Sequence, residues 1–201
     1  MNRPIHVLGI AGSLRAGSLN TAALRAAAEL LPEGMTLEIY DLSAIPMYNA
    51  DVDASGTPAA VQDFKNRIAA ADALLIATPE YNYSIPGVLK NALDWASRPA
   101  GRAPLNGKPL GIMGVATGRF GTVRAQMNLR QVAYGTGMLP LNRPEVMIAQ
   151  AADKFDAQGR LSDETSRQQI AELLAALAEW TQRLRGEAVV VPMEPALTVV
   201  H

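Results

Sequence analysis

The chain has 201 residues and a net charge of −1, with 18 % charged and 49 % hydrophobic side chains. These values favour one folded domain, because disordered chains combine a high net charge with low hydrophobicity. The lysines and arginines are scattered and form no basic stripe, which argues against nucleic acid as a partner, and the lack of cysteine excludes disulfides, thiolate metal sites and thiol redox chemistry.

The amino terminus predicts a cytoplasmic location. Residues 1–4 lead directly into a short apolar run and have neither the long apolar core nor the cleavage site of a signal peptide. No later run of apolar residues has the length needed to cross a membrane. We therefore expect no membrane insertion.

Strand-like and helix-like segments alternate in the first part of the chain. The apolar run 5–10 predicts a strand, and the alanine- and leucine-rich segment 20–31 predicts a helix. Residues 35–40, MTLEIY, alternate apolar and polar side chains as a half-buried strand does. Proline, glycine and several Asp and Asn residues mark 41–57 as a long loop.

The alternation continues to residue 148. Further helices are predicted at 58–70, 86–97 and 122–134, and further strands at 71–77, 109–115 and 140–148. The strand at 71–77 is apolar throughout, which indicates burial on both faces, as in the centre of a parallel sheet. Five strands interleaved with helices predict an α/β fold, with a doubly wound parallel sheet covered by helices on both faces.

The last helix is the most clearly periodic segment, with Ser162 as its expected N-cap. The apolar side chains of one face, which should close one side of the sheet, are Ile170, Leu173, Leu174, Leu177 and Leu184. Beyond Gly186 the pattern breaks into an apolar segment with two prolines. We therefore expect one domain over residues 1–186 and a tail of no assigned role over residues 187–201.

The loops after the first and third strands are the expected ligand site. Ligands of open α/β sheets bind where the strand order reverses, and in the flavodoxin-like order 2-1-3-4-5 this point lies between strands one and three. The first loop, 11–20, places glycines, serines and an arginine before the start of a helix, which is the composition of a phosphate site. It matches neither G-x-G-x-x-G nor the P-loop pattern. The alternative is an ordinary turn in which Ser18 or Asn20 only caps the helix.

The loop after the third strand, 78–83, carries two tyrosines, an asparagine and a proline, which suit a flat heteroaromatic ring. The alternative is that Tyr81 and Tyr83 simply pack over the edge of the sheet. The loop after the fourth strand, 116–122, again exposes backbone amides near the start of a helix. Together the three loops favour one cleft for a phosphorylated aromatic ligand.

Three motifs in these segments resemble a known family. They are GSLRAGSLN at 12–20, TPEYNYSIPGVLKNALDW at 78–95 and LNGKPLGIMG at 105–114. The chain resembles, from about residue 5 to 185, the NAD(P)H-dependent FMN reductases of the flavodoxin-like superfamily, which include bacterial quinone and chromate reductases and related azoreductases. The resemblance implies FMN as cofactor and NADPH or NADH as co-substrate.

The resemblance also implies roles for residues of the three loops. Those expected at the FMN phosphate are Ser13, Arg15, Ser18, Leu19 and Asn20. Those expected along the isoalloxazine and ribityl are Pro79, Glu80, Tyr81, Asn82 and Tyr83. Those expected at the far edge of the flavin are Thr117, Gly118 and Arg119, where relatives often have a richer run of glycine or serine. No dedicated catalytic side chain and no metal are expected, because the hydride chemistry belongs to the cofactor.

The implied function is transfer of hydride from NAD(P)H through FMN to a small acceptor, with quinones first and flavins, azo compounds or chromate after them. One alternative is an electron carrier of the flavodoxin type acting on protein partners, although such carriers are typically strongly acidic. Another is a binding protein that keeps the fold without FMN. The resemblance further implies a homodimer or homotetramer with Tyr83, Arg124 and Glu145 at the interface.

Overall fold

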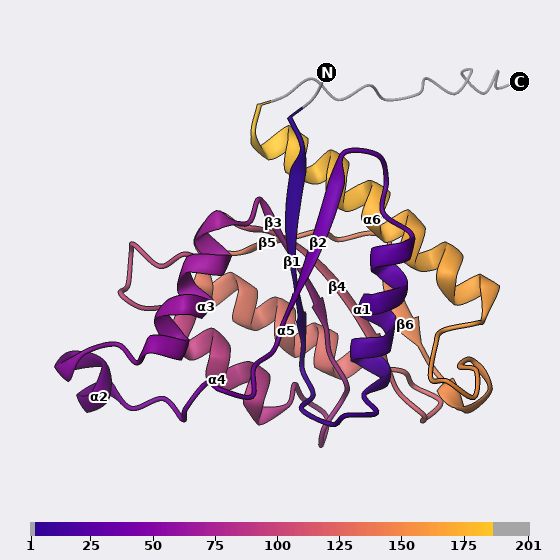
Figure 1. The fold of residues 1–201 in the computed structure, drawn as a ribbon, viewed down its shortest axis with the longest axis horizontal. Helices are drawn as coiled ribbons and strands as arrows, with labels where there is room; N and C mark the ends of the chain where they lie inside the picture. Colours follow the sequence, from indigo (N-terminus) through magenta and orange to yellow (C-terminus); the bar gives the residue numbers. More distant parts are fainter. Residues whose placement is uncertain (1–2, 187–201) are drawn as a thin grey trace, which may run out of the picture.

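The computed structural model describes residues 3–186, so the predicted tail at 187–201 lies outside the described residues. A parallel sheet forms the centre of the molecule (Figure 1). Its first four strands are β1 (Ile5–Ala11), β2 (Met35–Tyr40), β3 (Ala73–Ala77) and β4 (Pro109–Val115). The strand order is β2-β1-β3-β4-β5, and every pairing is parallel. The predicted doubly wound order is confirmed.

The fifth position of the sheet differs from the prediction. In place of one strand over 140–148, two short segments pair with β4, namely β5 (Leu139–Pro140) and β6 (Val146–Ile148). Pro144 lies between them and has no amide to donate to the ladder, so the chain leaves the sheet there. The described sheet therefore has six strands at five positions.

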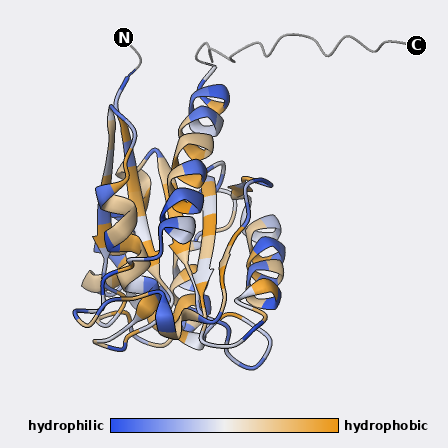
Figure 2. Ribbon diagram, turned by 90° about the vertical axis from the view of Figure 1, so that its right-hand side faces the viewer, coloured by the Kyte–Doolittle hydropathy of each residue, from blue (hydrophilic) through white to orange (hydrophobic). Residues whose placement is uncertain are grey.

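Helices cover both faces of the sheet (Figure 1). On one face lie α1 (Leu19–Glu29) and α6 (Glu164–Leu184), and on the other lie α3 (Ala59–Ala70), α4 (Gly87–Ala96) and α5 (Val123–Thr136). Each face has its own apolar core, and Figure 2 shows the strands as largely hydrophobic between helices of mixed character. All residues of β3 are buried, as its continuous apolarity predicts.

Part of the segment predicted as a long loop is helical. The short helix α2 (Ala50–Ser55) has no buried residue, so it lacks the apolar periodicity by which helices are recognised in sequence. Its start is stabilised locally, because the Asn49 side chain accepts a hydrogen bond from the Asp51 amide at 2.9 Å. A single 3₁₀ turn, η1 (Ala151–Asp153), precedes α6.

The last helix follows its predicted pattern except at the two ends. Ile170, Leu173, Leu174 and Leu177 are buried as expected, but Leu184 is 41 % exposed because it is the final residue of α6. The expectation of Ser162 as N-cap is wrong. Asp163 caps the helix instead, and its carboxylate accepts from the Ser166 amide at 2.9 Å.

The carboxyl ends of the strands meet at one edge of the sheet, at the bottom of Figure 1. The three loops of interest leave β1, β3 and β4 at that edge. Between residues 3 and 186 no helix has the length and apolarity needed to span a membrane.

Candidate functional site

The loop between β1 and α1 presents hydrogen-bond donors that the described chain does not use. The amides of Ser13, Leu14, Ala16 and Gly17 donate no hydrogen bond within residues 3–186, and neither do those of Leu19 and Asn20, because a helix start has no intrahelical acceptor for them. Within the same residues the Arg15 guanidinium has no hydrogen bond or ion pair. A cluster of unpaired donors at a helix start is suited to a phosphate.

Ser18 is the N-cap of α1, and its hydroxyl oxygen accepts from the Thr21 amide at 3.2 Å. This is the local role that the alternative interpretation of the loop predicts. The hydroxyl proton stays free to be donated, since a cap uses only the oxygen. Capping and ligand binding by Ser18 are therefore compatible.

The Asn20 side chain joins α1 to the end of β4. Its amide nitrogen donates to the Val115 carbonyl at 3.0 Å, and its amide oxygen accepts from the Val115 amide at 2.9 Å. Both bonds are buried, so the side chain is engaged with β4, and the backbone amide of Asn20 at the start of α1 stays unpaired. In sequence the two residues are 95 positions apart, and no local pattern marks their contact.

Gly12 allows the loop after β1 and the loop after β3 to approach each other. A Cβ atom at this position would lie 3.2 Å from the Thr78 hydroxyl and 3.3 Å from the Pro79 ring. A side chain here would require these neighbours to shift by a few tenths of an ångström, so the glycine suits the close approach of the two loops.

The loop after β3 ends in a tight turn at residues 81–84. The amides of Tyr81 and Ser84 donate to each other's carbonyls at 2.9 and 3.0 Å, and the central residues Asn82 and Tyr83 have φ of 49° and 70°. Both residues are in the left-handed region, as in a type I′ turn, and this conformation is strained for a tyrosine. The Asn128 side chain donates to the Tyr83 carbonyl at 3.0 Å, and the Arg124 guanidinium lies 3.9 Å from the Tyr83 ring centroid. Contacts with α5 therefore hold the turn.

Glu80 points away from the turn and caps α5. Its carboxylate accepts from the amides of Arg124 and Ala125 at 3.0 and 3.2 Å and forms an ion pair with the Arg124 guanidinium. Thr122, the residue at the N-cap position, makes no side-chain cap. The resemblance implies a place along the flavin for Glu80, and in the structure its carboxylate also fixes the start of the neighbouring helix.

The loop after β4 supplies a second set of free amides. Within residues 3–186 the amides of Thr117, Gly118, Arg119 and Phe120 donate no hydrogen bond. The Arg119 guanidinium lies over the Phe120 ring, 4.6 Å from its centroid. This loop faces the first across the ends of β1 and β3.

The three loops enclose a cavity of about 160 Å³. All the predicted site residues line it except Asn82, Tyr83, Gly118 and Arg119, which lie on the same loops outside it. Sequence reasoning missed two lining residues, Val115 and Ala116. Val115 ends β4 and Ala116 follows it in the loop 116–122, so the signal that could have found them is their place at the carboxyl end of a central strand.

The family of the chain follows from comparison with known proteins. Residues 5–153 match the family described as NADPH-dependent FMN reductase. The chain belongs to this family. It is 58 % identical over 186 residues to an NAD(P)H-dependent FMN reductase of Pseudomonas aeruginosa, a match that covers 92 % of this chain and 100 % of the relative.

Two further relatives extend the similarity. A 2-hydroxy-1,4-benzoquinone reductase of a Burkholderia species is 41 % identical over 176 residues, which cover 88 % of this chain and 96 % of the relative. Among solved structures, the flavoenzyme NAD(P)H:acceptor oxidoreductase FerB of Paracoccus denitrificans matches with a TM-score of 0.81 and 33 % identity. That match covers 89 % of this chain and 98 % of FerB.

Proposed function

We propose that this protein is an FMN-dependent oxidoreductase that passes hydride from NAD(P)H through FMN to a small acceptor of the quinone class. The observation that carries the proposal is the set of unpaired donors on the loop from Ser13 to Gly17, of which Ser13 and Arg15 line a cavity at the point where the strand order reverses. Relatives named as FMN and quinone reductases support the same chemistry.

The donor set fits the phosphate of FMN. The free amides of the first loop and the start of α1 would hold its oxygens, with the Ser13 and Ser18 hydroxyls beside them. The unpaired Arg15 guanidinium would add a charge-assisted hydrogen bond. Asn20 would act through its backbone, because Val115 occupies its side chain.

The ring of the cofactor would lie over the rim of the cavity. A volume of about 160 Å³ is small beside the 300–1,000 Å³ usual for cofactor pockets, so it suits the phosphate and ribityl. Pro79 and the half-exposed Tyr81 would flank the ring, with Asn82 and Tyr83 at its edge and the free amides of Thr117, Gly118 and Arg119 opposite them. FMN, when bound, supplies the hydride chemistry. The loops bind and orient it and exclude water from one of its faces.

A spectrum of the purified protein with FMN under nitrogen, before and after NADPH, tests the proposal. We expect the yellow flavin absorbance to bleach rapidly and to return when a quinone is added. Slow reduction by NADPH would favour an electron carrier, and failure to bind FMN would overturn the proposal. Because the reductant is a reduced nicotinamide of the cell interior, we also propose a cytoplasmic location.

We further propose that two or more copies assemble through α5 and the turn beside it. Large apolar side chains are exposed along this face, with Met127 at 59 % and Tyr134 at 90 %, and Tyr83 and Phe120 continue the face beyond the start of α5. The Arg124 guanidinium lies over both the Tyr83 and the Phe120 ring, 3.9 and 5.1 Å from their centroids. Covering such a face would remove apolar area from water. Within one chain Glu145 pairs with Arg143 at 3.8 Å and not with Arg124, so a network of Tyr83, Arg124 and Glu145 requires a second copy.

A further inference from the structure

A second cavity adjoins the proposed cofactor cavity. Its volume is about 400 Å³, and it lies between the first loop, α1 and the end of β2. Ser13 and Arg15 line both cavities, so they form the wall that the two share. The predicted site residues do not account for the rest of its lining, which includes Arg25, Ile39 and Asp41.

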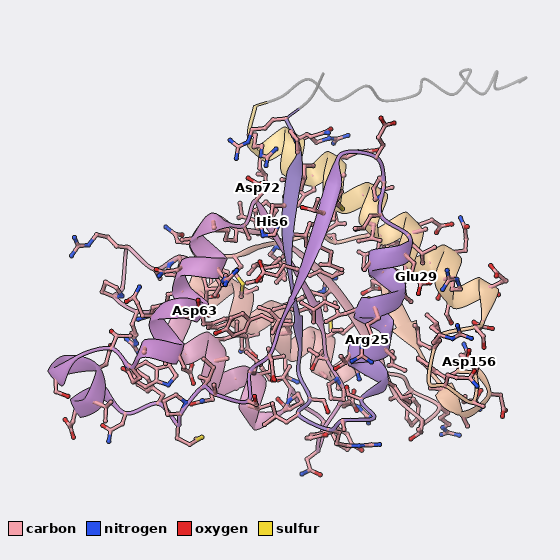
Figure 3. The ribbon with its side chains drawn as sticks, in the orientation of Figure 1. His6, Arg25, Glu29, Asp63, Asp72 and Asp156 are labelled. Atoms are coloured by element: carbon pink, nitrogen blue, oxygen red, sulfur yellow. The ribbon has the colours of Figure 1, made fainter. Side chains whose placement is uncertain are left out.

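The second cavity carries a net positive charge. Its lining contains the guanidiniums of Arg15 and Arg25, and within residues 3–186 neither makes a hydrogen bond or an ion pair. Asp41 also lines it, but its two oxygens accept from the Ser43 amide and hydroxyl, both at 2.9 Å. Figure 3 shows Arg25 on α1, and β2 supplies the opposite wall. If Arg15 serves the FMN phosphate, Arg25 is the cation left for another anion.

The same cavity has an apolar wall. Leu14 and Ile39 line it and are exposed to solvent, and Tyr40 lines it beside them. The Tyr40 hydroxyl donates to Asp63 at 3.0 Å, with the Ala60 carbonyl 3.3 Å away as a second acceptor for the same proton, so the residue offers its ring to a ligand and not its hydroxyl. An apolar wall beside free guanidiniums suits a ligand that joins a flat base to a phosphate.

We propose that this second cavity binds the adenosine end of NADPH, with Arg25 on the 2′-phosphate. The inference rests on the proposed function. When the nicotinamide of NADPH lies against the FMN ring, the adenosine end of the same molecule must bind near by, and this cavity shares a wall with the proposed cofactor cavity. Its volume falls within the range of small-molecule pockets. In dinucleotide-binding α/β folds a carboxylate accepts from the ribose 2′-hydroxyl of NAD, whereas an arginine accommodates the 2′-phosphate of NADP. Arg25 is the group of the second kind here, and Asp41, the residue after β2, stays paired with Ser43.

Binding of nucleotide fragments to the FMN-loaded protein tests this assignment without turnover. Adenosine 2′,5′-bisphosphate and adenosine 5′-monophosphate are titrated by calorimetry, with inorganic phosphate as a third ligand. We expect the bisphosphate to bind roughly tenfold more tightly than the monophosphate, and Arg25→Ala to remove most of that difference. Arg25→Lys should keep part of it. The ratio of kcat/KM for NADPH to that for NADH should fall in the same order.

The matched control is Arg102→Ala, which removes another exposed arginine, from the loop between α4 and β4 and outside the lining of this cavity. It should leave both nucleotide affinities as they are. Equal binding of the two nucleotides by the wild type, an unchanged preference in Arg25→Ala, or equally tight binding of inorganic phosphate would overturn the assignment. FMN affinity is measured on each variant, so a loss of the cofactor site is distinguished from a loss of this second site.

Discussion

The carboxylate of Glu80, on the loop after β3, caps the start of α5 by accepting the Arg124 amide at 3.0 Å and pairing with the Arg124 side chain. The Glu80 side chain is buried and that of Arg124 is about one-third exposed. The contact ties a wall of the proposed cofactor cavity to the helix that carries the proposed interface. Arg124 therefore joins Glu80, through the helix cap and the ion pair, to the Tyr83 ring that lies against its guanidinium.

We expect Glu80→Ala to lower the free energy of unfolding by about 2–3 kcal/mol. The change removes two hydrogen bonds at a helix start and leaves Arg124 without its carboxylate. Glu80→Gln keeps an acceptor of the same shape and should lose about 1 kcal/mol. Urea unfolding followed by circular dichroism gives both values. An Ala variant as stable as the wild type would show that the carboxylate does not cap α5.

Arg15→Ala should weaken FMN binding by about 1.5–3 kcal/mol, which is roughly ten- to a hundredfold. The reason is the loss of a charge-assisted hydrogen bond to the phosphate, so riboflavin, which has no phosphate, should bind the variant and the wild type equally. Fluorescence titration of both flavins measures the difference, with Arg102→Ala as the charge control. Equal losses for FMN and riboflavin would place Arg15 away from the phosphate.

Asn20→Leu should destabilise the protein by about 2–4 kcal/mol. It removes both partners of the buried Val115 amide and carbonyl, each of which costs about 1–3 kcal/mol when left unpaired. Thermal unfolding of the apoprotein isolates this effect from cofactor binding. Ser13→Ala, on the same loop but exposed to ligand, is the control and should unfold at nearly the wild-type temperature. A Leu variant that unfolds with the control would contradict the structural role of Asn20.

Asp72 should contribute stability that depends on pH. Burial alone would raise the pKa of its carboxyl, but the His6 amide at 2.8 Å and the side chains of Arg185 and Arg3 lower it below the ordinary value (Figure 3 labels Asp72 and His6). A lowered pKa in the folded state gives stability that is present above the unfolded value of about 4 and is lost as the pH falls through the folded value.

Asp72→Asn should therefore be less stable than the wild type at pH 7, and the difference should shrink as the pH falls below about 4. Urea unfolding across this range measures it, with Asp51→Asn in the exposed helix α2 as the control. A difference that stays constant from neutral to acid pH would show that the Asp72 carboxylate does not stabilise the fold through its charge.

Tyr134→Glu should reduce the mass of the particle in solution if α5 is the interface between copies. The substitution puts a charge on the most exposed apolar side chain of that face, which costs little in a monomer and much in a buried contact. Arg124→Ala should loosen assembly and alter turnover together, because it also releases Tyr83 and Glu80. Light scattering at several concentrations measures the mass, and a wild type that is monomeric throughout would remove the basis of the proposed assembly.

The local pattern of the chain determines most of the secondary structure. Alternation at Met35–Tyr40, continuous apolarity at Ala73–Ala77 and helical periodicity from Ile170 to Leu177 each follow from how a single element buries its side chains, so neighbouring residues suffice to predict them. The phosphate-type composition of the first loop is equally local. Helix α2 was not predicted, because it buries no side chain and its start depends on the Asn49 cap.

Only the tertiary structure decided what several site residues do. The Asn20 side chain contacts Val115, 95 residues away, and the Glu80 carboxylate contacts an amide 44 residues away. Hydrogen bonds of this kind depend on which strand ends and helix starts become neighbours in the fold. The residue types by themselves do not predict these contacts. The cavity at Arg25 and Asp41 likewise exists because β2 pairs with β1 and brings its end beside α1. The sequence determined which chemical groups lie at the carboxyl ends of the strands. The tertiary structure determined which of them hydrogen-bond to one another and which stay unpaired and available to a ligand.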